Sequence, residues 1–133
     1  MVNMEIQEII YQYLWKGMFS APIQDQLTCN SIRVLDIGCG TGSWLINMAE
    51  SYPKSTFVGV DITNFQRSAN LPNLAFIQSN IFDGLPFPDN TFDYVRQSNM
   101  MCSIRDHQWQ FVVDEITRVT KPGGWVEFMV YIY

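Results

Sequence analysis

The chain has 133 residues, 47% of them hydrophobic and 16% charged, which is the composition of a globular protein with one core and not of a disordered chain. Its formal net charge is −5 and its basic residues form no cluster, so we do not expect a nucleic-acid partner. No apolar stretch reaches the roughly 20 residues that cross a bilayer, so we expect no membrane partner either.

The chain begins with a predicted helix and a linker. Apolar residues recur at helical spacing over residues 3–16, and Gly17 is a plausible stop. Residues 20–31 contain a proline and are interpreted as a linker. The apolar run Ile32–Ile37 then predicts the first strand, and a helix is expected from Ser43 to about Ser51.

Four more strands and one more helix are predicted downstream. The strands are expected at Thr56–Val60, Leu74–Gln78, Phe92–Gln97 and Trp125–Tyr133. Residues 63–73 are rich in Asn and predict a loop with at most one helical turn, where a crossover helix is usual. Asp106 is a candidate cap for a helix whose apolar positions recur up to Val119, and the Pro-Gly-Gly within Lys121–Gly124 ends that helix.

The alternation of strands and helices predicts an α/β fold with right-handed crossovers and a doubly wound, mostly parallel sheet. We expect a single domain over residues 1–133, made of the N-terminal helix and linker (1–31) and a ligand-binding core (32–133). In such sheets the ligand lies beyond the carboxyl ends of the strands. Glycines or polar residues follow four of the predicted strands, so we expect them to line one pocket.

The glycine-rich stretch Val34–Gly42, with the sequence Val-Leu-Asp-Ile-Gly-Cys-Gly-Thr-Gly, is the most informative motif. A strand that ends in a glycine turn and continues into a helix forms a backbone cradle, which a ligand can approach closely because glycine has no Cβ. Asp36 precedes this turn. Its carboxylate would repel a diphosphate and attract a cationic amino group.

Together with three later motifs, this stretch resembles the class I S-adenosylmethionine-dependent methyltransferases. Val58–Asp61 resembles the acidic end of their second strand, Leu85–Tyr94 their approach to the fourth strand, and Lys121–Trp125 their turn into the fifth. The likeness covers residues 32–130, with the motifs in order. The short loop after the second strand and the segment before the first look most like fungal methyltransferases akin to regulators of secondary metabolism.

The resemblance implies a Rossmann-like sheet of five strands in the order 3-2-1-4-5, with S-adenosylmethionine as cofactor and S-adenosylhomocysteine as product. The backbone of the glycine loop would wrap the methionine part of the cofactor; the loop residues concerned are Gly38, Cys39, Gly40 and Gly42. Asp36 would face the cofactor's amino group, directly or through water. Asp61 would accept hydrogen bonds from both ribose hydroxyls.

Four further residues complete the implied site. Ile62 and Ile81 would pack on the adenine, and the Asn80 amide oxygen would accept a bond from the adenine amino group. Gln97 would close the pocket near the methionine end. A turn role for Asn80 and a helix-capping role for Asp61 remain as alternatives.

No catalytic residue and no metal site is assigned. The one histidine, His107, is interpreted as a surface or capping residue, and Cys29, Cys39 and Cys102 as reduced thiols of an intracellular protein, cytoplasmic or nuclear. Transfer of a sulfonium methyl group needs alignment and water exclusion more than it needs protein catalysts. The methyl acceptor, a small molecule or a protein, cannot be identified from the sequence.

Two other functions stay open. A nicotinamide-dependent oxidoreductase also uses a glycine turn and an acidic second strand, but its spacing is Gly-x-Gly-x-x-Gly, and Asp36 would lie beside the diphosphate. The other is a non-catalytic protein that binds the cofactor or a partner. The resemblance also implies strands beyond the fifth, so we expect a C-terminally truncated core that forms a homodimer through the fifth-strand edge, aggregates, or transfers methyl groups weakly.

Overall fold

The structure is a computed structural model that describes residues 6, 17–64, 66–98 and 104–129. Ile6 is helical, but the rest of the helix predicted over residues 3–16 lies outside the described residues. The end of the predicted fifth strand, residues 130–133, lies outside them as well.

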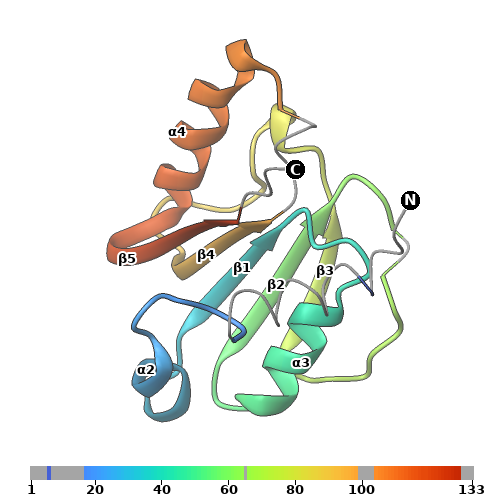
Figure 1. The fold of residues 1–133 in the computed structure, drawn as a ribbon, viewed down its shortest axis with the longest axis vertical. Coiled ribbons are helices and arrows are strands. Elements are labelled where there is room, and N and C mark those ends of the chain that lie inside the picture. The colour runs from blue at the N-terminus through green and yellow to red at the C-terminus, as the bar shows by residue number, and fades with distance from the viewer. Residues whose placement is uncertain (1–5, 7–16, 65, 99–103, 130–133) are drawn as a thin grey trace.

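Five parallel strands form one sheet in the predicted order β3-β2-β1-β4-β5 (Figure 1). The strands are β1 (Arg33–Ile37), β2 (Thr56–Asp61), β3 (Leu74–Gln78), β4 (Phe92–Ser98) and β5 (Thr120–Met129). All four pairings are parallel, so the carboxyl ends of the strands meet at one edge of the sheet. The strand order reverses at β1 and β4, which is where ligands bind in such sheets.

The described helices are α2 (Gln24–Cys29), α3 (Ser43–Ser51) and α4 (Trp109–Val119), with short 3-10 turns η1 (Ile81–Asp83) and η3 (Asp106–Gln108). Alternate residues of β1 point to opposite faces of the sheet. Val34 packs with Trp44 of α3, whereas Leu35 packs with Ile116 of α4. The helices α3 and α4 therefore cover opposite faces, each over its own apolar core.

Two expected segments differ from the sequence-based prediction. The predicted linker contains α2, which is held by its buried Leu27 even though its N-terminus has no side-chain cap. Lys121–Gly124 does not separate α4 from the fifth strand, because it belongs to β5. Phe92 lies opposite Thr120, and Tyr94 lies opposite Trp125. The residues of β5 between these two partners, Lys121–Gly124, therefore form a bulge.

The start of the last helix was also predicted at the wrong residue. Asp106 is the first residue of η3 and Arg105 occupies the cap position. The Arg105 N–H donates to Gln108 Oε1 at 3.0 Å, so a side chain from inside the turn, and not Asp106, satisfies the backbone there.

Connections on both sides of β3 lack helices of usual length. The described residues between β2 and β3 contain no helix, as predicted, and the β3–β4 connection holds only η1. Leu74 and Phe76 pack toward α3. Ala75 and Ile77 alternate with them, and both are exposed, Ile77 by 38%. The α4 side of β3 is therefore open.

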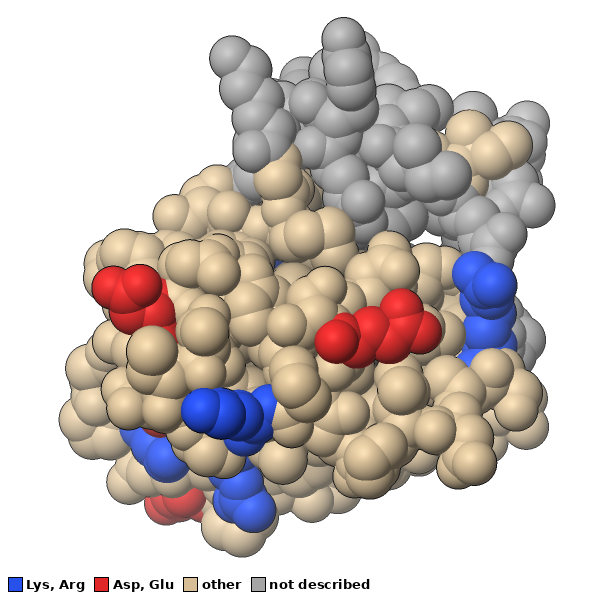
Figure 2. All heavy atoms as spheres, turned by 90° about the horizontal axis from the view of Figure 1, so that it is seen from below, with Lys and Arg blue, Asp and Glu red and all other residues tan. Residues whose placement is uncertain are grey.

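Charge is scattered over the end of the molecule from which the strands start. Figure 2 shows this end as mostly uncharged residues with basic and acidic side chains interspersed, and the described basic residues on that face form no continuous stripe.

Candidate functional site

The glycine loop (residues 38–42) leads from the carboxyl end of β1 to α3. Its three glycines have left-handed backbone angles, with φ of 74° at Gly38, 59° at Gly40 and 83° at Gly42. Side chains with a Cβ atom rarely adopt such angles. At Gly42 a Cβ would also collide with the Phe76 ring, so internal packing as well as backbone geometry requires glycine there.

Hydrogen bonds fasten the glycine loop to the end of β2. The N–H groups of Gly38 and Cys39 donate to the carbonyl oxygen of Val60 at 2.8 and 3.1 Å. The Gly40 N–H donates to Asp61 Oδ2 at 2.8 Å. The loop and the acidic strand end thus form one connected unit across the carboxyl ends of two neighbouring strands.

The Asp61 carboxylate is partly occupied by the protein itself. Besides the Gly40 bond, Oδ1 accepts bonds from the Thr63 N–H at 3.0 Å and the Thr63 hydroxyl at 2.9 Å. A carboxylate offers about four acceptor positions. One position therefore remains, and the Thr63 hydroxyl can rotate away to release another, so Asp61 can receive a pair of ligand hydroxyls.

The loop after β2 lies against the glycine loop. Gln66 Nε2 donates to the carbonyl oxygen of Gly40 at 3.1 Å, and the Arg67 N–H donates to that of Thr41 at 2.8 Å. Thr63, Gln66 and Arg67 were not predicted as site residues. Their region was expected to be a loop, but the sequence holds no signal for which carbonyls it would contact.

Asp36 is 1% exposed and forms a buried ion pair with Arg96 of β4. Arg96 Nη1 lies 3.3 Å from both carboxylate oxygens, and the guanidinium carbon lies 4.3 Å from the centre of the Trp44 ring. Sequence reasoning missed Arg96. Its signal is a cation in the middle of an apolar strand, which needs a buried partner, and the partner becomes clear only once the register places Arg96 beside Asp36.

Cys39 behaves as a structural thiol. Burial raises the pKa of the Cys39 thiol far above its ordinary range, and the Asp36 and Asp61 carboxylates raise it further. Its sulfur would lie 2.9 Å from a Cβ built on Gly59, so it fills space beside β2. A neutral, packed thiol is a poor nucleophile, which agrees with the interpretation of Cys39 as a filler.

The four residues expected around adenine and methionine have different surroundings. Ile62 is 63% exposed, whereas Ile81 is 5% exposed within the core beneath α4. Asn80 Oδ1 accepts the Phe82 N–H at 3.0 Å, so Asn80 has the turn role, with acceptor capacity left on the same oxygen. Gln97 is 3% exposed, and no donor within the described residues reaches its Oε1. An unpaired buried acceptor costs about 1–3 kcal/mol.

The described residues contain neither a metal-binding cluster nor a membrane-spanning helix. No group of three or more His, Cys, Asp or Glu side chains in that part of the chain could hold a metal ion. No helix there is both long enough and apolar enough to cross a membrane.

Comparison with known proteins identifies the family. Residues 34–124 match a family model described as a methyltransferase domain. The chain belongs to this methyltransferase-domain family. The matched range begins at β1 and ends in the β5 bulge, so it contains the glycine loop, Asp61 and Arg96. The predicted resemblance is confirmed at the level of the family.

Curated relatives of this methyltransferase-domain chain come from bacteria and fungi. It is 37% identical over 101 residues to a demethylmenaquinone methyltransferase of Geobacillus kaustophilus (strain HTA426), covering 69% of this chain and 42% of the relative. It is 34% identical over 100 residues to the secondary metabolism regulator laeA of Coprinopsis cinerea, covering 74% of this chain and 24% of the relative. The chain spans less than half the length of these relatives.

A solved structure supports the same placement. The chain resembles PKMT2 from Rickettsia typhi, solved in complex with AdoHcy, with a TM-score of 0.67 and 25% identity over 84% of this chain and 25% of that chain. The Rossmann-like methyltransferase fold predicted from the motif order is therefore confirmed.

Proposed function

We propose that this chain binds S-adenosylmethionine at the carboxyl ends of β1 and β2 and supports transfer of its methyl group to an acceptor. The observation that carries the proposal is the bond from the Gly40 N–H to Asp61 Oδ2, which joins the glycine cradle to the acidic strand end. This bond fixes the glycine loop beside a carboxylate, and the pair suits a ligand that has both a polar chain and a diol.

Asp61 is the ribose ligand in this proposal. Its remaining acceptor position and the exchangeable Thr63 hydroxyl bond provide for two ribose hydroxyls. Asp36 is enclosed and paired with Arg96, so it acts on the cofactor's ammonium group through an ordered water and not by direct contact. Ile62 is exposed beside Asp61 and offers an apolar surface to the adenine.

The bound cofactor supplies an activated methyl group. The glycine loop and the loop after β2 are bonded to each other through Gln66 and Arg67, so together they would hold the cofactor in one position. The methyl acceptor in our proposal is a small molecule or a protein. The protein is placed in the cytoplasm or the nucleus. The bacterial demethylmenaquinone methyltransferase supports methyl transfer, whereas the fungal relative is described only as a regulator of secondary metabolism.

Isothermal titration calorimetry with S-adenosylhomocysteine and with NAD tests the cofactor. We expect S-adenosylhomocysteine to bind and NAD to bind poorly. Asp61→Asn should weaken S-adenosylhomocysteine binding about 10- to 100-fold, the effect of losing charge-assisted bonds worth about 1.5–3 kcal/mol.

Asp114→Asn is the matched control, because it removes the same charge from the exposed face of α4, where Asp114 contacts Gln110. It should leave the affinity unchanged. Tight NAD binding without a response to S-adenosylhomocysteine would reject the proposal in favour of an oxidoreductase. Equal binding by the wild type and Asp61→Asn would remove Asp61 from the site.

A further inference from the structure

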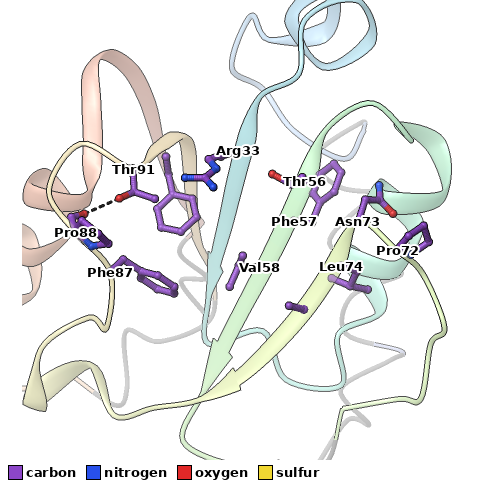
Figure 3. A pocket seen from close by; sticks show the side chains of 12 residues that line it. Arg33, Thr56, Phe57, Val58, Pro72, Asn73, Leu74, Phe87, Pro88 and Thr91 are labelled. Carbon is purple, nitrogen blue, oxygen red and sulfur yellow. Dashed lines mark hydrogen bonds between the residues drawn. The ribbon is translucent and has the colours of Figure 1, made fainter.

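A second pocket lies at the opposite end of the sheet from the glycine loop. It has a volume of about 430 Å³, and its walls include Arg33, Thr56, Val58, Phe87, Thr91 and Phe92 (Figure 3). Arg33, Thr56 and Phe92 are the first residues of β1, β2 and β4. The pocket is therefore built on the amino ends of the strands, and none of its lining residues belongs to the proposed cofactor site.

The pocket exists because the β3–β4 connection does not cover the sheet. Only η1 interrupts that connection, and the segment that follows it runs past the sheet and brings Phe87 towards Val58 of β2 (Figure 3). The Phe87 ring is fixed edge-on against Phe92, with ring centres 4.9 Å apart and planes at 89°. One side of the pocket is thus a rigid apolar wall of aromatic and branched side chains.

The other end of the pocket carries a cation. The Arg33 N–H donates to Asp93 Oδ2 at 2.8 Å, but within the described residues the Arg33 guanidinium has no hydrogen bond and no ion pair. The nearby Asp93 carboxylate is paired with Lys121 Nζ at 3.3 Å. Arg33 is exposed and its side chain lies beside the pocket residues Thr91 and Thr56 in Figure 3.

Hydroxyl groups flank this cation. The Thr91 hydroxyl donates to the carbonyl oxygen of Pro88 at 2.7 Å, so its oxygen remains an acceptor. No partner for the Thr56 hydroxyl is found among the described residues, so this group remains a donor. One guanidinium, one hydroxyl donor and an apolar wall together complement a molecule with a single anionic head and an apolar body.

We propose that this pocket binds a small carboxylate with an aromatic body. The Arg33 guanidinium receives the carboxylate in a two-pronged pair, and the ring lies between Phe87 and Val58. The volume lies in the range of about 300–1,000 Å³ that is usual for small-molecule sites. A single cation suits a carboxylate better than a nucleotide with several phosphates.

Titration of the 133-residue chain with 2-naphthoate, followed by two-dimensional amide NMR, tests the proposal. We expect saturable shifts at Val58, Phe87 and Thr91 and none at Gly40. The neutral analogue 2-naphthalenemethanol should bind about tenfold more weakly, because it cannot form charge-assisted bonds. Arg33→Gln should reduce 2-naphthoate affinity by a similar factor and leave the analogue's affinity unchanged.

Lys54→Gln is the matched control, because Lys54 is an exposed cation near the start of β2 and does not line the pocket. It should have no effect. Phe87→Ala should weaken both the acid and the alcohol, which separates the apolar wall from the charge. Equal affinity of the wild type and Arg33→Gln for 2-naphthoate, or an absence of shifts at the pocket, overturns the proposal. S-adenosylhomocysteine binding should be the same in all three variants. A failure of the carboxylate-pocket proposal can therefore be told apart from a failure of the proposed function.

Discussion

Asp36 shows how one contact changes an electrostatic argument at the residue scale. The sequence predicts that its carboxylate attracts the ammonium group of a ligand. In the structure, Arg96 lies 3.3 Å from both of its oxygens, so the chain supplies a cation itself. Buried charges persist only when they are paired, and removal of one partner typically costs about 3–5 kcal/mol. Arg96 therefore places a positive charge against the Asp36 carboxylate beneath the glycine loop, whether or not a ligand is bound.

Gly42 and Gly123 show two different reasons why a position needs glycine: the backbone angle, and the space that a Cβ atom would take. Both have left-handed backbones, with φ of 83° and 81°, but a Cβ at Gly42 would collide with the Phe76 ring, whereas a Cβ at Gly123 would meet nothing within 4 Å. Gly123→Ala should destabilise the chain by about 1–2 kcal/mol, the cost of the backbone angle alone. Gly42→Ala should add the cost of overpacking, about 1–3 kcal/mol more.

Urea unfolding of the two alanine variants measures this difference directly. Circular dichroism at low urea should show that both retain the fold. If the two variants lose the same stability, the Phe76 ring moves aside without cost, and the glycine at position 42 serves the backbone angle only.

At the scale of elements, periodicity and glycine turns predicted the central sheet well. The bounds of α3 and β3 agree with the prediction, and β1, β2 and β4 differ by a single residue at one end. These segments have buried apolar runs between clear breakers. The order of the strands came from the family resemblance and not from the periodicity itself.

Other elements depend on tertiary contacts that the sequence does not display. The six-residue α2 has no side-chain cap, and it is held by Leu27 in the core and by Ser55, whose hydroxyl donates to the Leu27 carbonyl at 3.0 Å. The Pro-Gly-Gly before Trp125 reads as a break, but pairing with β4 on both sides keeps it within β5 as a bulge. The Asp36–Arg96 pair likewise needed the register of β1 and β4.

A pair on α4 fixes the segment between η1 and β4. Arg118 Nε donates to Glu115 Oε2 at 2.7 Å, and the same guanidinium donates to the carbonyl oxygens of Leu85 and Phe87 at 2.9 and 2.7 Å. Glu115 Oε1 accepts the Leu85 N–H at 2.7 Å. The helix therefore provides both donors and acceptors to a loop that has no regular structure of its own.

The Glu115–Arg118 pair and its bonds to Leu85 and Phe87, here called the clamp, predict a pH-dependent stability. The hydrogen bond from Arg118 lowers the pKa of Glu115, so its ionised form is favoured in the folded state. In the unfolded chain the pKa of a glutamate is about 4.3. The contribution of the ionised Glu115 to the stability of the fold is therefore complete above that pH, and it is lost as the pH falls through the lower pKa of the folded state. Glu115→Gln should therefore lower the urea midpoint at neutral pH, and the gap to the wild type should narrow in strong acid.

Parallel urea titrations at neutral and acidic pH measure that gap. Glu50→Gln is the matched control, since Glu50 is an exposed residue of α3. It should show little difference from the wild type at either pH. A gap for Glu115→Gln that stays constant across the pH range would mean that the carboxylate charge does not contribute to the clamp.

At the scale of the whole molecule, the sheet has two different edges. Both edge strands expose apolar side chains: β3 exposes Ile77 by 38%, whereas β5 exposes two aromatic side chains, Trp125 by 45% and Phe128 by 41%. Within the described part of the chain β5 pairs only with β4, so no described strand covers its other side. Exposed apolar edge strands promote pairing with other chains.

We therefore predict that the 133-residue chain self-associates through β5. Light scattering over a concentration series should show a rise towards dimer mass or larger, and Phe128→Lys should return the chain to monomer, because a lysine on an edge strand opposes edge pairing. Phe111→Lys is the matched control: Phe111 is 43% exposed but lies on the helix α4 and not on a strand, so this variant should associate like the wild type. A monomer at every concentration would contradict the prediction. Equal loss of association in both variants would mean that association depends on exposed apolar side chains in general and not on the edge of β5.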